Sequence, residues 1–174
     1  MLLRLKRATV NDIPDIVKLC KSVNEKLGSQ LGRHIWSKFL STEGVHLQMH
    51  KATVEVAREE GILVAMFTLS MQKPWSIDER LFKPALRPLY LTDLAVHPLW
   101  RRHGIEQLCI GKAIRIAEGW PSDSLRLDTS DIEFGSEVSL NEFGFRSIGT
   151  NWLYDPPSIY FERPICKTLD LRFM

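Results

Sequence analysis

The sequence has few cysteines, and they lie far apart. Cys20, Cys109 and Cys166 are the only three in 174 residues, so neither a disulfide framework nor a CxxC metal pair is expected. No apolar run approaches the ~18–20 residues that span a bilayer. The regularly spaced charges of residues 1–7 predict a strand rather than a signal peptide. From these absences we expect a protein of the reducing cytosol that has no membrane partner.

The net charge is also small. Lys and Arg number 23 and Asp and Glu number 21, which leaves a formal charge of +2. General nucleic-acid binders are usually far more basic, so no nucleic-acid partner is expected. A composition of 44% hydrophobic and 25% charged residues excludes wholesale disorder. At ~100–200 residues per domain, the length predicts one domain over residues 1–174.

Apolar periodicity predicts strands interspersed with helices. Alternation and short apolar runs indicate strands, and apolar spacings of three and four residues indicate helices. We expect the first helix to end at Gly28 and the second helical region to be interrupted at Gly44. The predicted strands are 2–8, 53–58, 62–70, 89–96, 125–128, 146–153 and 159–162, and the predicted helices are 11–27, 35–50, 104–119 and 136–143.

This order of elements predicts an α/β or α+β fold. Strand 89–96 is expected at the centre of the sheet, because its run is mostly apolar. The segment 71–88 carries three prolines and is predicted to be an irregular insertion, in which Ser76 and Glu79 form a capping box for one helical turn. A short tail is expected after about residue 164.

The turn after strand 89–96 predicts an anion site. It leads into a helix, and a helix N-terminus presents unpaired N–H groups and the positive end of a dipole. Gly104 allows the backbone to approach a phosphate closely, and Arg101 and Arg102 add positive charge. A solvated basic helix start is the alternative that these residues leave open.

The same segment resembles motif A of the GCN5-related N-acetyltransferase (GNAT) family. In that motif, Arg/Gln-x-x-Gly-x-Gly/Ala follows a strand end of the form Leu-Ala-Val-x-Pro. Here it is Arg101-Arg-His-Gly-Ile-Glu106, after Leu94-Ala-Val-His-Pro98. Three further segments resemble the family in the expected order, so that the resemblance covers nearly the whole chain: 7–12, 125–129 and 141–145.

The resemblance implies a mixed, twisted sheet that splays at its middle and is flanked by helices. It also implies acetyl-CoA or another acyl-CoA as donor, no metal, and direct attack of an amine on the thioester, with a backbone donor near Val96 stabilising the oxyanion. Leu94, Ala95 and Val96 would offer backbone groups to the pantetheine and the acyl carbonyl. The cofactor-binding residues around the pyrophosphate would be Arg101, Arg102, His103, Gly104, Ile105, Glu106 and Gln107.

Several positions depart from the family pattern. Glu106 stands where the motif has Gly or Ala, Leu140 where a tyrosine often protonates the leaving thiolate, and Glu133 where an asparagine is frequent. The usual general-base positions fall on Tyr90 and Thr92, which we take as the candidate catalytic residues. Neither is a strong base at pH 7, so a base acting through ordered water, or an amine that binds unprotonated, would be required.

The acceptor side is predicted from the segment 71–88 and two tryptophans. Asp78 and Glu79 could attract a cationic amine, and Trp36 and Trp75 could line the acceptor pocket. The alternatives are a solvated helix cap for the two acids and a core position for the two aromatic rings.

No metal site is expected. His46 and His50 are spaced to share a helix face, but Leu47 stands where a zincin motif requires Glu. A solvated helix face is the alternative for this pair.

We interpret the sequence as a cytoplasmic acyl-CoA-dependent N-acyltransferase that acts on a small-molecule or peptide amine, and it is compatible with a homodimer. One alternative is a module of the same fold that binds acyl-CoA with little or no turnover, which Glu106 and Leu140 favour. A second is a nucleic-acid-binding domain that uses Arg101, Arg102 and Arg115, which the small net charge disfavours.

Overall fold

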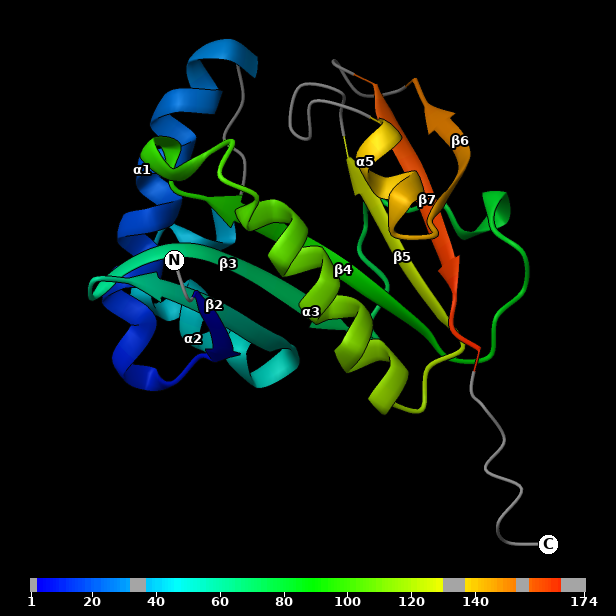
Figure 1. Ribbon diagram of the computed structural model, residues 1–174, viewed down its shortest axis with the longest axis horizontal. Helices are drawn as coiled ribbons and strands as arrows, with labels where there is room; N and C mark the ends of the chain where they lie inside the picture. Colours follow the sequence, from blue (N-terminus) through cyan, green and yellow to red (C-terminus); the bar gives the residue numbers. More distant parts are fainter. Residues whose placement is uncertain (1–2, 32–36, 130–136, 153–156, 167–174) are drawn as a thin grey trace, which may run out of the picture.

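One mixed sheet organises the chain (Figure 1). The computed structural model describes residues 3–31, 37–129, 137–152 and 157–166. Within them, seven strands pair in the order β1-β2-β3-β4-β5-β7-β6, and every pair is antiparallel except β4–β5, which is parallel. The strands are β1 (Arg4–Arg7), β2 (Thr53–Glu59), β3 (Ile62–Ser70), β4 (Pro88–Val96), β5 (Ser124–Thr129), β6 (Arg146–Asn151) and β7 (Ser158–Pro164).

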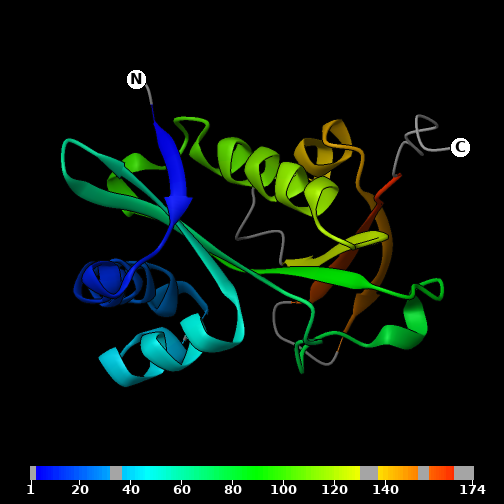
Figure 2. The same cartoon turned by 90° about the horizontal axis from the view of Figure 1, so that it is seen from below.

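Helices cover the two faces of the sheet unequally (Figure 2). α1 (Ile13–Leu31) and α2 (Thr42–Lys51) pack on one face of the β1–β4 half, which we call the α1 face. α3 (Ile105–Gly119) and α5 (Glu137–Glu142) lie on the opposite face, the α3 face. Over β5–β7, the α1 face is covered by the segment 71–87, which contains the short helix η3 (Glu79–Leu81).

The side-chain pattern of each element explains this packing. α3 buries a stripe at helical spacing, which includes Ile105, Cys109 and Ala113. Along β4, Leu89 and Leu91 belong to the core under α3, whereas Tyr90 packs with the segment 71–87. Since successive strand residues point to opposite faces, β4 is buried on both sides, as its apolar run predicted.

The fold class is confirmed, but three local predictions were wrong. α1 continues past Gly28, because buried packing of its apolar face outweighs the ~1 kcal/mol that a helical glycine costs. α2 runs through Gly44, where a Cβ would collide with the carbonyl oxygen of Lys38. The turn in 71–88 is capped by Asp78 rather than Ser76, because the Ser76 hydroxyl donates to Asp128 of β5.

No helix in the described part of the chain is long and apolar enough to cross a membrane.

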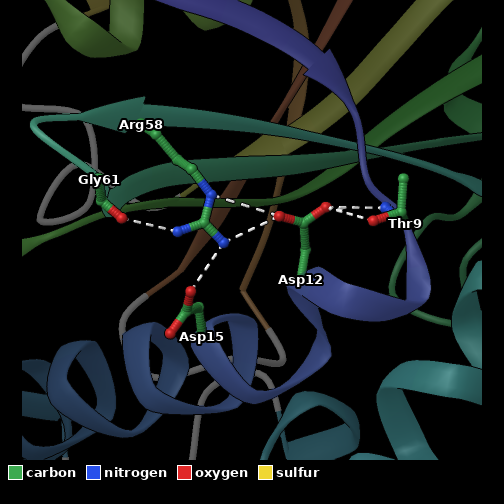
Figure 3. Close-up of polar contacts among 5 residues, drawn as sticks. All are labelled: Thr9, Asp12, Asp15, Arg58 and Gly61. Carbon is green, nitrogen blue, oxygen red and sulfur yellow. Dashed lines mark hydrogen bonds and ion pairs between the residues drawn. The ribbon is translucent and has the colours of Figure 1, made fainter.

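An ion cluster fixes the start of α1 to the hairpin of β2 and β3 (Figure 3). Arg58 donates to Asp12 at 2.8 Å, to Asp15 at 2.7 Å and to the Gly61 carbonyl at 2.8 Å. Asp12 also accepts from the backbone N–H and the hydroxyl of Thr9. The contacts close the first turn of the helix and orient α1 along the sheet.

We expect Asp12→Asn to lower the free energy of unfolding by about 1–3 kcal/mol at neutral pH, the range for hydrogen bonds to a charged group. Burial alone would raise the pKa of Asp12, but the hydrogen bonds from Thr9 and Arg58 outweigh it and bring the pKa below 3.8. A lowered pKa contributes stability above the unfolded value, and that contribution is lost as pH falls through the folded pKa. The difference between Asp12→Asn and wild type in urea unfolding should therefore shrink below about pH 4.

Asp15→Asn is the matched control for this prediction. Asp15 binds the same guanidinium, but its side chain is 46% exposed against 5% for Asp12, so its loss should cost less than ~1 kcal/mol. An equal loss for the two variants, or a loss for Asp12→Asn that persists unchanged at acid pH, would contradict the assignment.

Candidate active site

The central feature of the site is a split between β4 and β5. The two strands pair only from Pro88 to Tyr90, against Ser124 to Arg126, and then separate (Figure 1). Beyond Tyr90, β4 pairs on its other side with β3 up to Val96, while no described residue pairs with its β5 side. The β5-facing backbone groups of residues 91–96 are thus available to a ligand.

A β-bulge in β4 places two polar side chains next to the split. Thr68 of β3 pairs with Thr92 and Met66 with Ala95, so Asp93 and Leu94 both stand opposite one residue. Asp93 has a φ of 56°, a left-handed conformation that Asp tolerates better than most residues. As a result, Thr92 and Asp93 both lie on the α1 face, and Leu94 packs on the α3 face.

Asp93 is the functional candidate that the sequence interpretation missed. Its side chain is 8% exposed and binds the ammonium of Lys38 at 2.9 Å, and it accepts a hydrogen bond from the Thr92 hydroxyl at 2.7 Å. The available signal was a carboxylate within the apolar strand 89–96, a position at which a structural acid is rare.

The turn between β4 and α3 forms an anion site. Arg102 and Gly104 have φ values of 64° and 75°, and the first helical bond runs from Leu108 N–H to the Gly104 carbonyl at 3.1 Å. The N–H groups of Ile105, Glu106 and Gln107 therefore have no partner within the helix. His103 Nδ1 donates to the carbonyl of Arg101 at 2.8 Å, which closes the turn.

Comparisons with known proteins agree with this geometry. No family model and no curated protein matches the chain in sequence. Among solved structures, the ribosomal-protein-S18-alanine N-acetyltransferase of Escherichia coli has a TM-score of 0.71 at 12% identity, over 99% of this chain and 100% of that one. An acetyltransferase of the GNAT family from Staphylococcus aureus has a TM-score of 0.67 at 13% identity, over 94% and 99%.

The chain has the GNAT fold.

A third structure of this fold contains coenzyme A. It is the PaiA N-acetyltransferase of Thermoplasma acidophilum, with a TM-score of 0.69 at 12% identity over 94% of this chain and 99% of that one. The splayed sheet that the motifs implied is thus confirmed, and the GNAT fold brings residues 94–96 and the turn 101–107 to the same end of β4.

Tyr90, a candidate catalytic residue, lies where β4 and β5 are still paired. Its side chain is fully buried, and its hydroxyl donates to Glu79 at 2.6 Å. Burial, and secondly this hydrogen bond, raise the pKa of Tyr90 to about 12. Its phenol therefore stays protonated at neutral pH and cannot act as a general base there. Thr92 lies beyond it in the split portion of β4, with its hydroxyl held by Asp93.

The predicted acceptor residues lie apart from one another. Asp78 caps η3 and binds Arg80 at 2.6 Å, whereas Glu79 holds Tyr90. Trp75 is 84% exposed, and Trp36 is outside the described residues. Contacts within the segment therefore engage both acids, and their contact with a substrate stays a prediction.

A second carboxylate lies on β5, across the split. Asp128 accepts from the hydroxyls of Ser76 and Ser158 at 3.4 and 3.1 Å, and the Tyr160 hydroxyl donates to the Ser76 carbonyl at 2.6 Å. Burial is the main cause that raises the pKa of Asp128. These contacts hold the segment 71–87 on β5 and β7, beside the open end of the split.

Glu106 lies half-buried in the first turn of α3, where an acid favours the helix dipole by ~0.3–1 kcal/mol. Two unit charges at ~4 Å repel by roughly 4 kcal/mol at an effective dielectric of 20, before salt and rotation reduce the repulsion. We expect Glu106→Ala to lower the melting temperature slightly and to tighten acetyl-CoA binding at low salt, with a gain that shrinks as salt rises. Calorimetric titrations at two salt concentrations measure both effects, with Glu118→Ala at the far end of the helix as control. Unchanged affinity of Glu106→Ala at low salt would show that its carboxylate points into solvent.

Proposed function

We propose that the chain is an N-acyltransferase that moves the acetyl group of acetyl-CoA to a primary amine of a small molecule or peptide. The observation that carries the proposal is the split of β4 from β5 beside a helix N-terminus built on Gly104. The neighbours of the same fold named as acetyltransferases support it, and so does the neighbour with coenzyme A. We retain the cytoplasm as the proposed location.

The residues fit a pantetheine and a pyrophosphate. The β5-facing backbone of residues 94–96 would pair with the amides of the pantetheine arm, as a neighbouring strand would. The N–H groups of residues 105–107 and the guanidinium groups of Arg101 and Arg102 would hold the pyrophosphate. Gly104 permits this approach because it has no Cβ and adopts a positive φ.

In the proposed reaction, the amine nitrogen attacks the thioester carbonyl, the carbon–sulfur bond breaks, and the thiol leaves with a proton. A backbone N–H near Val96 would stabilise the developing oxyanion. Asp93, at the bulge, is the carboxylate of β4 that faces the acceptor side of the split. It would bind the incoming ammonium, and loss of the amine proton to solvent would precede the attack.

A module of the same fold that binds acyl-CoA without turnover is the second candidate. The observation that favours it is the position of Leu140, which is buried in the core under α3 at 1% exposure and offers no proton to a thiolate. Thiol release measured over a panel of primary amines and short peptides, beside calorimetry of CoA binding, separates the two candidates. Turnover of any amine supports the enzyme, and binding without turnover across the panel supports the module.

A further inference from the structure

Polar groups without a protein partner gather on the α1 face around the bulge of β4. Thr68 lies directly across from Thr92 in the sheet, and its side chain therefore shares the α1 face with Thr92. Thr68 is 2% exposed, and its hydroxyl has no hydrogen-bond partner. An unpaired buried hydroxyl costs free energy, so this position favours a ligand that supplies the missing partner.

Asn24 of α1 is a second such group. Cys20 lies against Met66 of β3, with 3.6 Å between the sulfur atoms, and the charge of Asp93 adds to burial in raising the pKa of Cys20. Asn24 follows Cys20 by one turn on the same helix face, and α1 contacts both β3 and β4. Asn24 is 8% exposed, yet neither its amide nitrogen nor its carbonyl oxygen has a partner.

The carboxylate between these groups is paired with a cation that can leave. The Lys38 side chain is 42% exposed, while Asp93 is 8% exposed. Lys38 belongs to the short helix η2 (Ser37–Phe39), and its backbone is set close to α2 because Gly44 has no Cβ. The ammonium thus reaches the buried carboxylate from the solvent side, along the direction from which an acceptor amine would arrive.

We propose that Lys38 occupies, on Asp93, the position of the acceptor's ammonium group, as an intramolecular competitor that a cationic amine must displace. The inference rests on the proposed function, because it concerns the acceptor side of the same split. It makes Asp93 a specificity-determining residue for positively charged primary amines. Thr68 and Asn24 are the neighbouring groups that complete the hydrogen bonds of the bound ammonium or of the polar atoms next to it.

A purely structural ion pair would behave differently. If Lys38 and Asp93 only stabilised the fold, removal of either residue would lower stability and leave the KM for the amine unchanged. If Lys38 competes with the substrate, its removal lowers the KM, and removal of Asp93 raises it. The two effects are also coupled, because Lys38 has nothing to occupy once the carboxylate is neutral.

The experiment measures kcat and KM for the panel amine with the lowest KM, at saturating acetyl-CoA. We expect Lys38→Met to lower the KM about three- to fivefold, in line with an ion pair that is open to solvent on one side. Asp93→Asn should raise it at least about tenfold, since it removes a charge-assisted contact, and Asn preserves the left-handed bulge. In the double variant, Lys38→Met should have no further effect. Lys112→Met is the control, because Lys112 pairs at 3.9 Å with a buried carboxylate, Glu55, which lies on the other face of the sheet.

A binding measurement separates failure of this inference from failure of the proposed function. The panel amines are titrated by calorimetry into the CoA-saturated wild type and variants. If no amine is turned over but Lys38→Met binds one of them more tightly than wild type, the transferase proposal fails and the inference holds. Lys38→Met with an unchanged KM and unchanged amine affinity, or with a lower KM that survives in the Asp93→Asn background, overturns the inference.

Discussion

Gly104→Val is expected to weaken acetyl-CoA binding about 100-fold while the protein stays folded. Gly104 has a φ of 75°, which is a strained conformation for a β-branched residue, so the turn must rearrange at a cost of about 1–3 kcal/mol. Rearrangement re-aims the N–H groups that would hold the pyrophosphate, and charge-assisted contacts are worth about 1.5–3 kcal/mol. A loss of about 2.8 kcal/mol corresponds to the 100-fold change, and calorimetric titration measures it.

Gly61→Val is the matched control for this substitution. Gly61 has a φ of 82° and open space around its Cβ position, so valine there carries a similar backbone strain at a site far from the turn. Its acetyl-CoA affinity should equal that of wild type, with a comparable decrease in melting temperature. An unchanged affinity in folded Gly104→Val would remove the turn from the binding site.

Arg126→Met is expected to lower the free energy of unfolding by about 3–5 kcal/mol, the cost of leaving a buried charge unpaired. The Arg126 side chain is 3% exposed and binds Glu162 of β7 at 2.8 Å. Its guanidinium also donates to the carbonyl of Lys83 at 2.7 Å and lies 4.5 Å from the centre of the Phe82 ring. One side chain therefore joins β5, β7 and the segment 71–87, and denaturant unfolding should show the loss.

The double variant Arg126→Met/Glu162→Met keeps this prediction testable if the single variant does not fold. When both charges are replaced by apolar side chains of similar volume, stability is often near that of wild type. We expect the double variant to recover most of the loss. Recovery that fails, or a single variant that loses less than ~1 kcal/mol, would show that the charge pair is not the main contribution of Arg126.

The sequence predicted the elements whose apolar pattern is periodic. The stripe of α3 and the apolar run of β4 are local features, and both predictions agree with the structure. The anion site also followed locally, because Gly104 and the two arginines adjoin a strand end. The ends of α1 and the continuity of α2 did not follow, because they depend on packing between distant residues, such as Gly44 against the Lys38 carbonyl.

The acceptor side was less predictable for a related reason. A simple alternating strand would place Asp93 and Thr92 on opposite faces, and only the bulge, with Asp93 at positive φ, brings both to the α1 face. The partner of Asp93 is Lys38, 55 positions earlier in the chain, a contact that no local pattern indicates. Tyr90 was placed correctly on β4, but the bond to Glu79 that keeps its phenol protonated became visible only in the folded chain.

Amide chemical-shift mapping on titration with acetyl-CoA tests the central claim most directly. The account predicts saturable shifts concentrated in residues 94–96 of β4 and in the turn and first helical residues 101–107, because these backbone groups would bind the ligand. Shifts should be small in the hairpin of β2 and β3 around Gly61, which lies outside the site. No saturable shifts at millimolar acetyl-CoA, or shifts confined to other parts of the sheet, would contradict the account.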